Sequence, residues 1–257
     1  MKDRIHYHRA YKKLAPIRRG SAALLFLLVA GLDACIAYWH EPILGRFVGV
    51  VARILAWCGI PATVTTWTFL PTWVTHMPVL DADGVFPSRR FALAAFVISV
   101  LLVVLLPRLR RVPKAISVYI VFLALLNTAS AAFFVVAPHL FPYDVLDFSL
   151  LYMGTQFGMW LLLPVVMGVV LAPIPARTPE KFLVILLTVC YAAVFGAVRY
   201  AAFLYLLNAI TVLHMAAMFF ALGPLIDFVY LVAIYAIYVN IVALRLGNKP
   251  EIWRWSF

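Results

Sequence analysis

Long apolar runs separated by short clusters of basic residues form the main pattern of the chain. An α-helix needs about 20 mostly apolar residues to cross roughly 30 Å of hydrocarbon. Four runs of suitable length come before Ala172, and they are Ser21–Trp39, Phe91–Leu106, Ala115–Val136 and Ser149–Leu171. The pattern therefore predicts an all-α polytopic membrane protein.

A further apolar stretch, Phe182–Leu246, is longer than one span requires. It holds either two unusually long helices or three helices joined by tight turns. Two helices place the basic C-terminal residues on the same side as the other basic clusters, as the positive-inside rule favours. We therefore expect about six transmembrane helices with both chain ends in the cytoplasm, the last two being long enough to tilt or protrude.

The first apolar run ends in Tyr38–His40, and no small-residue cleavage site follows it. This pattern favours a retained signal anchor over a cleaved signal peptide. Residues 1–20 then form a basic cytoplasmic tail, and residues 41–90 form an interfacial segment on the other side of the membrane. The whole chain, 1–257, is expected to be a single integral membrane domain.

Two kinds of structure are expected within the 41–90 segment. Pro42–Cys58 has apolar residues at helical spacing and two arginines on another face, which is typical of a short helix lying in the membrane interface. Thr63–Val74 is rich in β-branched and aromatic residues and predicts a small extended segment outside the hydrocarbon. Asp81–Gly84 is expected to form a turn.

Composition and charge agree with this picture. Of the 257 residues, 66% are hydrophobic and 12% are charged, whereas a soluble domain has about 25% charged residues. The formal net charge of +11 comes from basic clusters that border the apolar runs. Such clusters face anionic lipid headgroups, so we expect the lipid bilayer, and no nucleic acid, as a partner. The clusters lie within Lys12–Arg19, Arg108–Lys114, Arg177–Lys181 and Arg245–Arg254.

Four ionisable residues stand inside the expected spans, and they are Asp33, Arg199, His214 and Asp227. Ionisable groups are costly in hydrocarbon and usually face a partner or a cavity. Arg199 lies 15 residues before His214, and Asp227 lies 13 residues after it, so both stand at nearly the same depth in antiparallel helices. We expect Arg199 to pair with Asp227, with Asp33 as the alternative. Such a cluster either fixes the register of the helices or lines a polar intramembrane pocket.

A second polar group lies in segments expected on the outer face, and it comprises His76, Asp81, Asp83 and His139. These residues are the candidates for a membrane-embedded hydrolase, although carboxylates and histidines beside turns are usually solvated. The cysteines are scattered, at Cys35, Cys58 and Cys190, and predict neither a disulfide framework nor a zinc site. No two histidines stand four residues apart, so we expect no metal and no cofactor.

Residues 41–170, about half of the chain, show a further order of features. An interfacial helix is followed by LAWCGIPATVTTWTFLP, a helix, a basic loop, a helix, LLNTASAAFFVVAPHLFPYDVLDFS and another helix. This order resembles that of the exosortase/archaeosortase family of membrane-embedded transpeptidases. The resemblance rests also on Gly59-Ile60-Pro61, on Asn127 and on the loop containing Phe-Pro. That family has a Gly-Ile-Pro-Val lead-in strand, a Cys-Ser-Gly helix start, an Asn-x-x-Arg motif and a His just before the following helix.

The catalytic positions of the family are not retained. No Cys-Ser-Gly occurs between residues 74 and 91, where Asp81 and Asp83 stand instead. Ser130 takes the place of the motif's Arg, and residues 147–151 hold no His. Cysteine transpeptidation cannot operate without a thiolate, its basic activator and the Arg.

The sequence therefore predicts a non-catalytic, exosortase-like subunit of an envelope or exopolysaccharide-related complex. This subunit would be a multi-pass protein of the bacterial inner (plasma) membrane, assembled with other membrane proteins. One alternative is a small transporter or lipid-handling membrane protein with a polar pocket lined by Arg199, His214 and Asp227. The other alternative is the membrane-embedded hydrolase or peptidase that the outer polar group would serve.

Overall fold

The structure is a computed structural model, and the residues it describes are 12–14, 19–68, 76–109, 112–246 and 253–255. Six of the helices in these residues are long and apolar enough to cross a membrane. This confirms the predicted all-α polytopic fold and the count of six spans. Most of the predicted N-terminal tail, part of the Thr63–Val74 extended segment and part of the loop Arg108–Lys114 lie outside the described residues.

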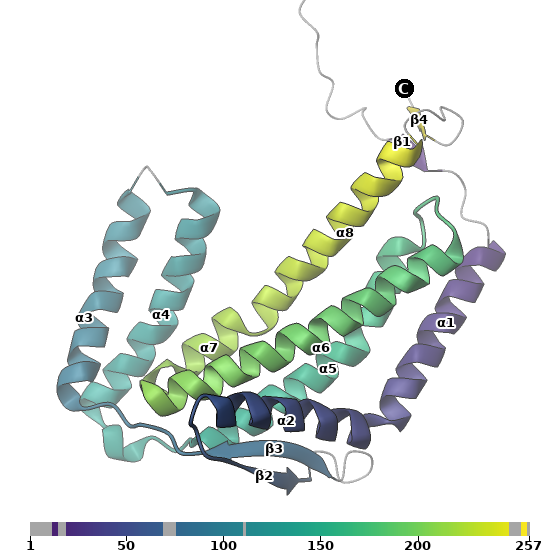
Figure 1. Ribbon diagram of the computed structural model, residues 1–257. Helices are drawn as coiled ribbons and strands as arrows, with labels where there is room; N and C mark the ends of the chain where they lie inside the picture. Colours follow the sequence, from purple (N-terminus) through teal and green to yellow (C-terminus); the bar gives the residue numbers. More distant parts are fainter. Residues whose placement is uncertain (1–11, 15–18, 69–75, 110–111, 247–252, 256–257) are drawn as a thin grey trace, which may run out of the picture. The chain divides into compact units, whose positions relative to one another are not determined.

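The long helices, the short helix α2 and the β2–β3 segment follow the predicted order, whereas the β1–β4 pair was not predicted (Figure 1). The helices are α1 Arg19–Tyr38, α2 His40–Trp57, α3 Arg89–Leu105, α4 Lys114–Val136, α5 Val145–Leu171, α6 Thr178–Ala209, α7 Met215–Leu222 and α8 Pro224–Leu246. Short 3₁₀ turns are η2 Leu106–Arg108, η3 Pro138–Leu140 and η4 Val212–His214. The strands are β1 Lys12–Leu14, β2 Ala62–Trp67, β3 Met77–Ala82 and β4 Trp253–Trp255, which pair as β1–β4 and β2–β3.

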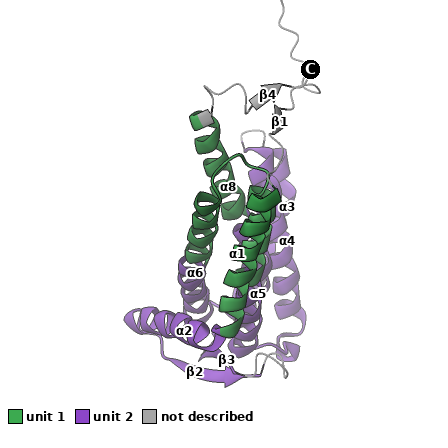
Figure 2. Cartoon of the chain, turned by 90° about the vertical axis from the view of Figure 1, so that its right-hand side faces the viewer, with its two compact units in different colours: residues 1–38, 160–192, 229–257 green, residues 39–159, 193–228 purple. Residues whose placement is uncertain are grey.

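The chain forms two compact units, which Figure 2 distinguishes by colour. Unit 1 comprises residues 1–38, 160–192 and 229–257, and unit 2 comprises residues 39–159 and 193–228. The long helices α5, α6 and α8 each contribute one part to unit 1 and the other part to unit 2.

Polar contacts near helix ends tie unit 1 together. The hydroxyls of Ser21 and Thr178 are 2.7 Å apart and hydrogen-bonded, and Arg245 forms an ion pair with Glu180. These contacts bring the start of α1, the start of α6 and the end of α8 to the same side of the membrane. An even number of spans places the two ends of a chain on the same side of a membrane, so these contacts agree with six spans.

The amphipathic helix predicted after the first span is α2 in unit 2. Its apolar face is fully buried through Leu44, Val48, Val51 and Leu55. Gly59 follows with a φ of +75°, a left-handed conformation that glycine adopts without a steric penalty and that commonly ends a helix.

The strands β2 and β3 form an antiparallel hairpin beside α2. The backbone N–H of Leu80 donates to the Tyr200 hydroxyl at 3.3 Å, so it points away from Val64, its partner on β2. The Val64–Leu80 pair is therefore not hydrogen-bonded. Hydrogen-bonded and non-hydrogen-bonded pairs alternate along an antiparallel ladder, so the Thr66–Pro78 pair, two positions away, is not hydrogen-bonded either. The missing N–H of Pro78 therefore costs the hairpin nothing.

The turn predicted at Asp81–Gly84 is wrong in its first half. Asp81 and Ala82 belong to β3, where they pair with Thr63 and Ala62 of β2. The reason is that this strand is mostly buried, and burial together with strand pairing prevails over the local preference of Asp for turns.

Just after β3, the backbone of Val85 forms hydrogen bonds to α6 and to η4. The Val85 N–H donates to the Leu207 carbonyl at 3.1 Å, and the Val212 N–H donates to the Val85 carbonyl at 2.9 Å. A side chain at Gly84 would lie 2.6 Å from Val145 and 2.7 Å from Val212, so glycine is needed there. We call this end of unit 2, formed by β2, β3 and the starts of α5 and η4, the hairpin side.

The fourth span begins earlier than the predicted Ser149. The Asp147 N–H donates to the Asp144 carboxylate at 2.8 Å, and the Asp144 N–H donates to the Asp147 carboxylate at 3.1 Å. This reciprocal capping box satisfies backbone donors at a helix start. It explains why α5 starts at Val145, within the loop expected at Pro138–Phe148.

Candidate functional site

The sixth span is interrupted at Gly223, between α7 and α8. Pro224 opens α8, where its missing N–H is tolerated but its ring cannot continue the preceding helix. A side chain at Gly223 would collide with the carbonyl oxygen of Phe219. The single continuous helix predicted for this span is therefore wrong, because Gly-Pro breaks it inside the apolar run.

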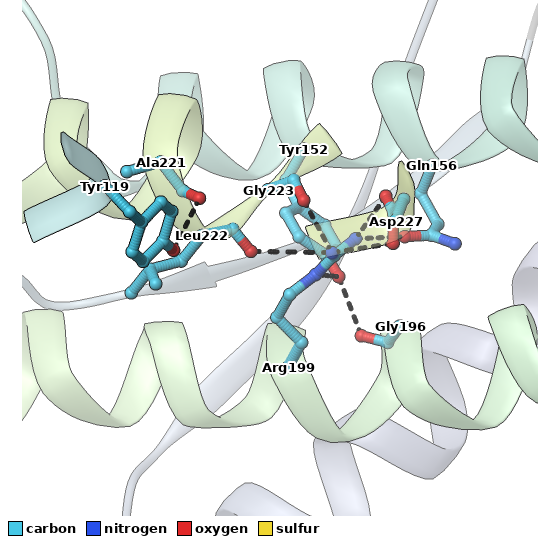
Figure 3. A network of polar contacts seen from close by, with 9 residues as sticks. All are labelled: Tyr119, Tyr152, Gln156, Gly196, Arg199, Ala221, Leu222, Gly223 and Asp227. Atoms are coloured by element: carbon cyan, nitrogen blue, oxygen red, sulfur yellow. Dashed lines mark hydrogen bonds and ion pairs between the residues drawn. The ribbon is translucent and has the colours of Figure 1, made fainter. Parts of the chain in front are cut away.

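The break leaves carbonyl groups at the end of α7 that side chains from other helices satisfy (Figure 3). The Tyr119 hydroxyl of α4 donates to the Ala221 carbonyl at 2.9 Å. Arg199 Nη1 of α6 donates to the Gly223 carbonyl at 3.0 Å and lies 3.5 Å from the Leu222 carbonyl. Within a bilayer no water replaces such contacts, so these side chains stabilise the break.

Arg199 also forms the ion pair expected with Asp227. Nη1 lies 2.8 Å from Oδ1 and Nη2 lies 3.0 Å from Oδ2, a bidentate geometry. The two side chains are only 7% and 2% exposed. Asp227 lies in the first turn of α8, where the helix dipole favours a negative charge. The pairing predicted from equal depth is confirmed.

Two side chains of α5 complete the surroundings of the guanidinium. Arg199 Nε donates to the Tyr152 hydroxyl at 3.2 Å, and Nη2 donates to the side-chain oxygen Oε1 of Gln156 at 3.0 Å. The Tyr152 hydroxyl in turn donates to the Gly196 carbonyl at 2.7 Å. A side chain at Gly196 would lie 2.8 Å from the Gln156 amide, so this glycine leaves room for Gln156. All three guanidinium nitrogens are thus engaged within unit 2, in what we call the Arg199 network.

His214 takes part in a different hydrogen-bond chain. Its Nδ1 lies 2.6 Å from the side-chain oxygen Oδ1 of Asn127, and Asn127 Nδ2 donates to the Ser99 hydroxyl at 2.9 Å. Since the Asn127 amide nitrogen donates to Ser99, its side-chain oxygen accepts a hydrogen bond from the Nδ1–H of His214. His214 directly precedes α7, so this chain ties the start of α7 to α4 and α3. Polar contacts therefore hold α7 at both of its ends.

The four ionisable residues expected to form one intramembrane cluster are not joined by hydrogen bonds into a single cluster. Arg199 and Asp227 pair, and His214 bonds to Asn127. Asp33 lies on α1 in unit 1, and its Oδ1 is buried without a hydrogen-bond partner among the described residues. The hydrogen bonds of Arg199 and Asp227 that we describe are all formed within unit 2.

The outer polar residues do not form one compact site. Asp81 lies five residues after His76 along an extended segment, and this separation corresponds to about 16 Å. Asp83 offers its backbone carbonyl to the Asn208 side chain at 2.8 Å, and His139 is exposed in η3. Within the described parts of the chain, His, Cys, Asp and Glu side chains form no group of three or more that could hold a metal ion.

An apolar pocket of about 650 Å³ lies within unit 2. Its walls include Phe148 of α5 and the α7 residues Met215 and Phe219, and Trp67 and Tyr143 lie outside the spans. Asp147 and Ser130 are among the few polar residues that line it. This pocket is largely apolar and does not include Arg199, His214 or Asp227, unlike the polar pocket considered from the sequence.

Comparison of the chain with protein-family models, with curated proteins and with solved structures finds no match. Its class is that of a multi-pass helical membrane protein with a broken sixth span.

Proposed function

We propose that the chain is a non-catalytic integral subunit of an envelope or exopolysaccharide-related complex in the bacterial inner membrane, built on an exosortase-like scaffold. The observation that carries this proposal is the closed Arg199 network. Each guanidinium nitrogen donates to a protein group, and both carboxylate oxygens of Asp227 accept from it. A buried charge held in this way determines helix register and is not offered to a substrate.

The positions that the resemblance singles out support the same proposal. Ser130 stands where the family has the Arg of its Asn-x-x-Arg motif, and it lies in the pocket wall. Asn127 of the same motif connects His214 with Ser99. In a scaffold that has lost its chemistry, we expect motif residues to take part in helix packing, as Asn127 does.

The broken sixth span favours a transporter instead. Transporters use helix breaks near the membrane midplane to bind ions and substrates through freed backbone groups. In this protein the freed carbonyls of Ala221 and Gly223 already accept hydrogen bonds from Tyr119 and Arg199. We therefore rank the transporter below the non-catalytic subunit.

The proposed topology has both chain ends in the cytoplasm and the hairpin side facing outward. A green fluorescent protein fused after Phe257 should fluoresce, because this fusion then lies in the cytoplasm. Alkaline phosphatase inserted at Pro138, which is exposed in η3, should be active, because this enzyme folds only outside the cytoplasm. A dark fluorescent fusion together with an active phosphatase fusion at Phe257 would overturn the topology.

Simultaneous replacement of Cys35, Cys58 and Cys190 by alanine should leave the protein's cellular function intact. All three side chains are exposed, and they lie on α1, just after α2 and on α6, so the stability should change by no more than about 0.5 kcal/mol per site. The test is complementation of a strain that lacks this chain, with membrane abundance measured in parallel. Loss of function at normal abundance would contradict a non-catalytic role, and Asp81→Asn and Asp83→Asn variants test the hydrolase in the same assay.

The proposal predicts a stoichiometric partner. We expect the full chain, purified from its native membranes in a mild detergent, to bring another integral membrane protein with it at a fixed ratio. The matched control is an unrelated six-span protein of similar abundance carrying the same tag. A monodisperse homo-oligomer without a second protein would contradict the subunit role.

A further inference from the structure

We infer that the apolar pocket of unit 2 binds the hydrocarbon chain of a zwitterionic or neutral membrane lipid that enters from the leaflet on the hairpin side. The walls of the pocket lie at a shallow depth in the spans. Phe220 lies eight residues after the start of the sixth span at Val212, a depth of about 12 Å. Leu151 and Ser130 each lie six residues from the ends of their own spans, at about 9 Å. These walls therefore fit within one leaflet of a hydrocarbon layer about 30 Å thick.

The volume and the lining of the pocket determine what can fill it. A volume of about 650 Å³ is within the usual range of small-molecule sites. Water needs several polar partners in a cavity, and these walls are mainly Phe, Leu, Val and Met. At this depth in a bilayer, the molecules that match such walls are hydrocarbon chains.

The residues at the mouth of the pocket determine which lipid headgroup fits. Trp67, Thr68 and Tyr143 line the pocket from outside the spans, and Trp and Tyr are favoured at the membrane–water interface. The only charged residue among the lining residues is Asp147, which repels an anionic headgroup. A zwitterionic lipid with an amine, or a neutral lipid, fits this mouth.

The protein holds one wall of the pocket in place. The α7 residues Met215, Ala216, Phe219 and Phe220 form that wall. The hydrogen bonds of His214 fix the start of α7 and those of Arg199 fix its end. A short helix held at both ends gives the pocket a fixed shape before a lipid enters. This inference does not depend on the partner proposed above, so either proposal can fail alone.

The test is photo-crosslinking in nanodiscs with phosphatidylethanolamine that carries a diazirine on its acyl chain. We expect crosslinks to concentrate on peptides of α7 and the start of α5. Ala216→Trp should fill the pocket and lower this labelling at least fivefold. The control is Ala94→Trp, since Ala94 is exposed on α3 and lies about 8 Å from the start of its span. Thermal unfolding is measured for both variants, and Ala216→Leu serves if Ala216→Trp does not fold.

Three results would overturn the inference. One is equal labelling of α7 in the wild-type protein, in the folded Ala216 variant and in Ala94→Trp, because bulk lipid contact then explains the crosslinks. Another is stronger labelling by diazirine phosphatidylglycerol or a diazirine polyprenyl phosphate, because an anionic lipid is then the ligand. The third is a peptide segment of another protein crosslinked at α7 in place of lipid.

Discussion

Replacing either Arg199 or Asp227 with leucine should lower the free energy of unfolding by about 3–5 kcal/mol, because the remaining charge is left buried and unpaired. Replacing both should cost much less than the sum of the two single changes, since two apolar side chains leave no uncompensated charge. The coupling energy in this double-mutant cycle is therefore expected to be large.

The cycle is measured by reversible denaturation in mixed micelles. The control cycle uses the partly exposed pair Arg245 and Glu180, whose side chains are 62% and 30% exposed. Exposed pairs typically contribute about 0.2–1 kcal/mol, so the control coupling should be small. Additive costs for Arg199 and Asp227 would mean that the two residues do not interact.

The substitution Gly223→Ala should also be strongly destabilising. The new methyl group would meet the Phe219 carbonyl oxygen, and backbone atoms cannot move away as the end of a flexible side chain can. We expect a loss of about 1–3 kcal/mol or more, as for other overpacked sites. Thermal unfolding in detergent gives the measurement.

Gly158→Ala is the matched control for Gly223→Ala. Gly158 is exposed on α5, and a side chain there would have no atom within 4 Å. Alanine in a helix interior is better than glycine by about 0.5–1 kcal/mol, so this variant should be neutral or slightly more stable. Equal destabilisation by the two substitutions would show that the backbone at Gly223 is not specially constrained.

The spans and the ion pair were predictable for simple physical reasons. Apolar runs of about 20 residues are strongly constrained by the thickness of the bilayer. Arg199 and Asp227 needed partners because charges in hydrocarbon are costly, and helices joined by a short turn are antiparallel neighbours. Counting residues from the turn near His214 was then enough to match the two depths.

Other features had local signals that the hydrophobic pattern conceals. The Gly223-Pro224 pair predicts a break once it is noticed inside an apolar run. The Asp144-x-x-Asp147 spacing is that of a capping box and indicates the earlier start of α5. Both signals are short, and the long apolar runs around them favour continuous or shorter helices.

The partners of the Arg199 network were not predictable from the sequence. Which side chains face Arg199 depends on how each helix is rotated about its axis. In α5 the apolar residues surround the whole helix, so their spacing does not show which face carries Tyr152 and Gln156 inward. The same holds for Tyr119 on α4. Only the packing of the helices reveals how these three side chains stabilise the break in the sixth span. Tyr119 donates to the freed Ala221 carbonyl, and Tyr152 and Gln156 accept from Arg199, which donates to the Gly223 carbonyl.

The central claim is that the intramembrane charges hold the helices together and take no part in chemistry. The most direct test is the double variant Arg199→Leu/Asp227→Leu in a strain that lacks this chain. If the variant reaches normal membrane abundance, we expect it to restore the cellular function and to retain its partner on purification. A folded, abundant double variant that fails to restore function would contradict the account, because the charges would then act beyond holding the structure.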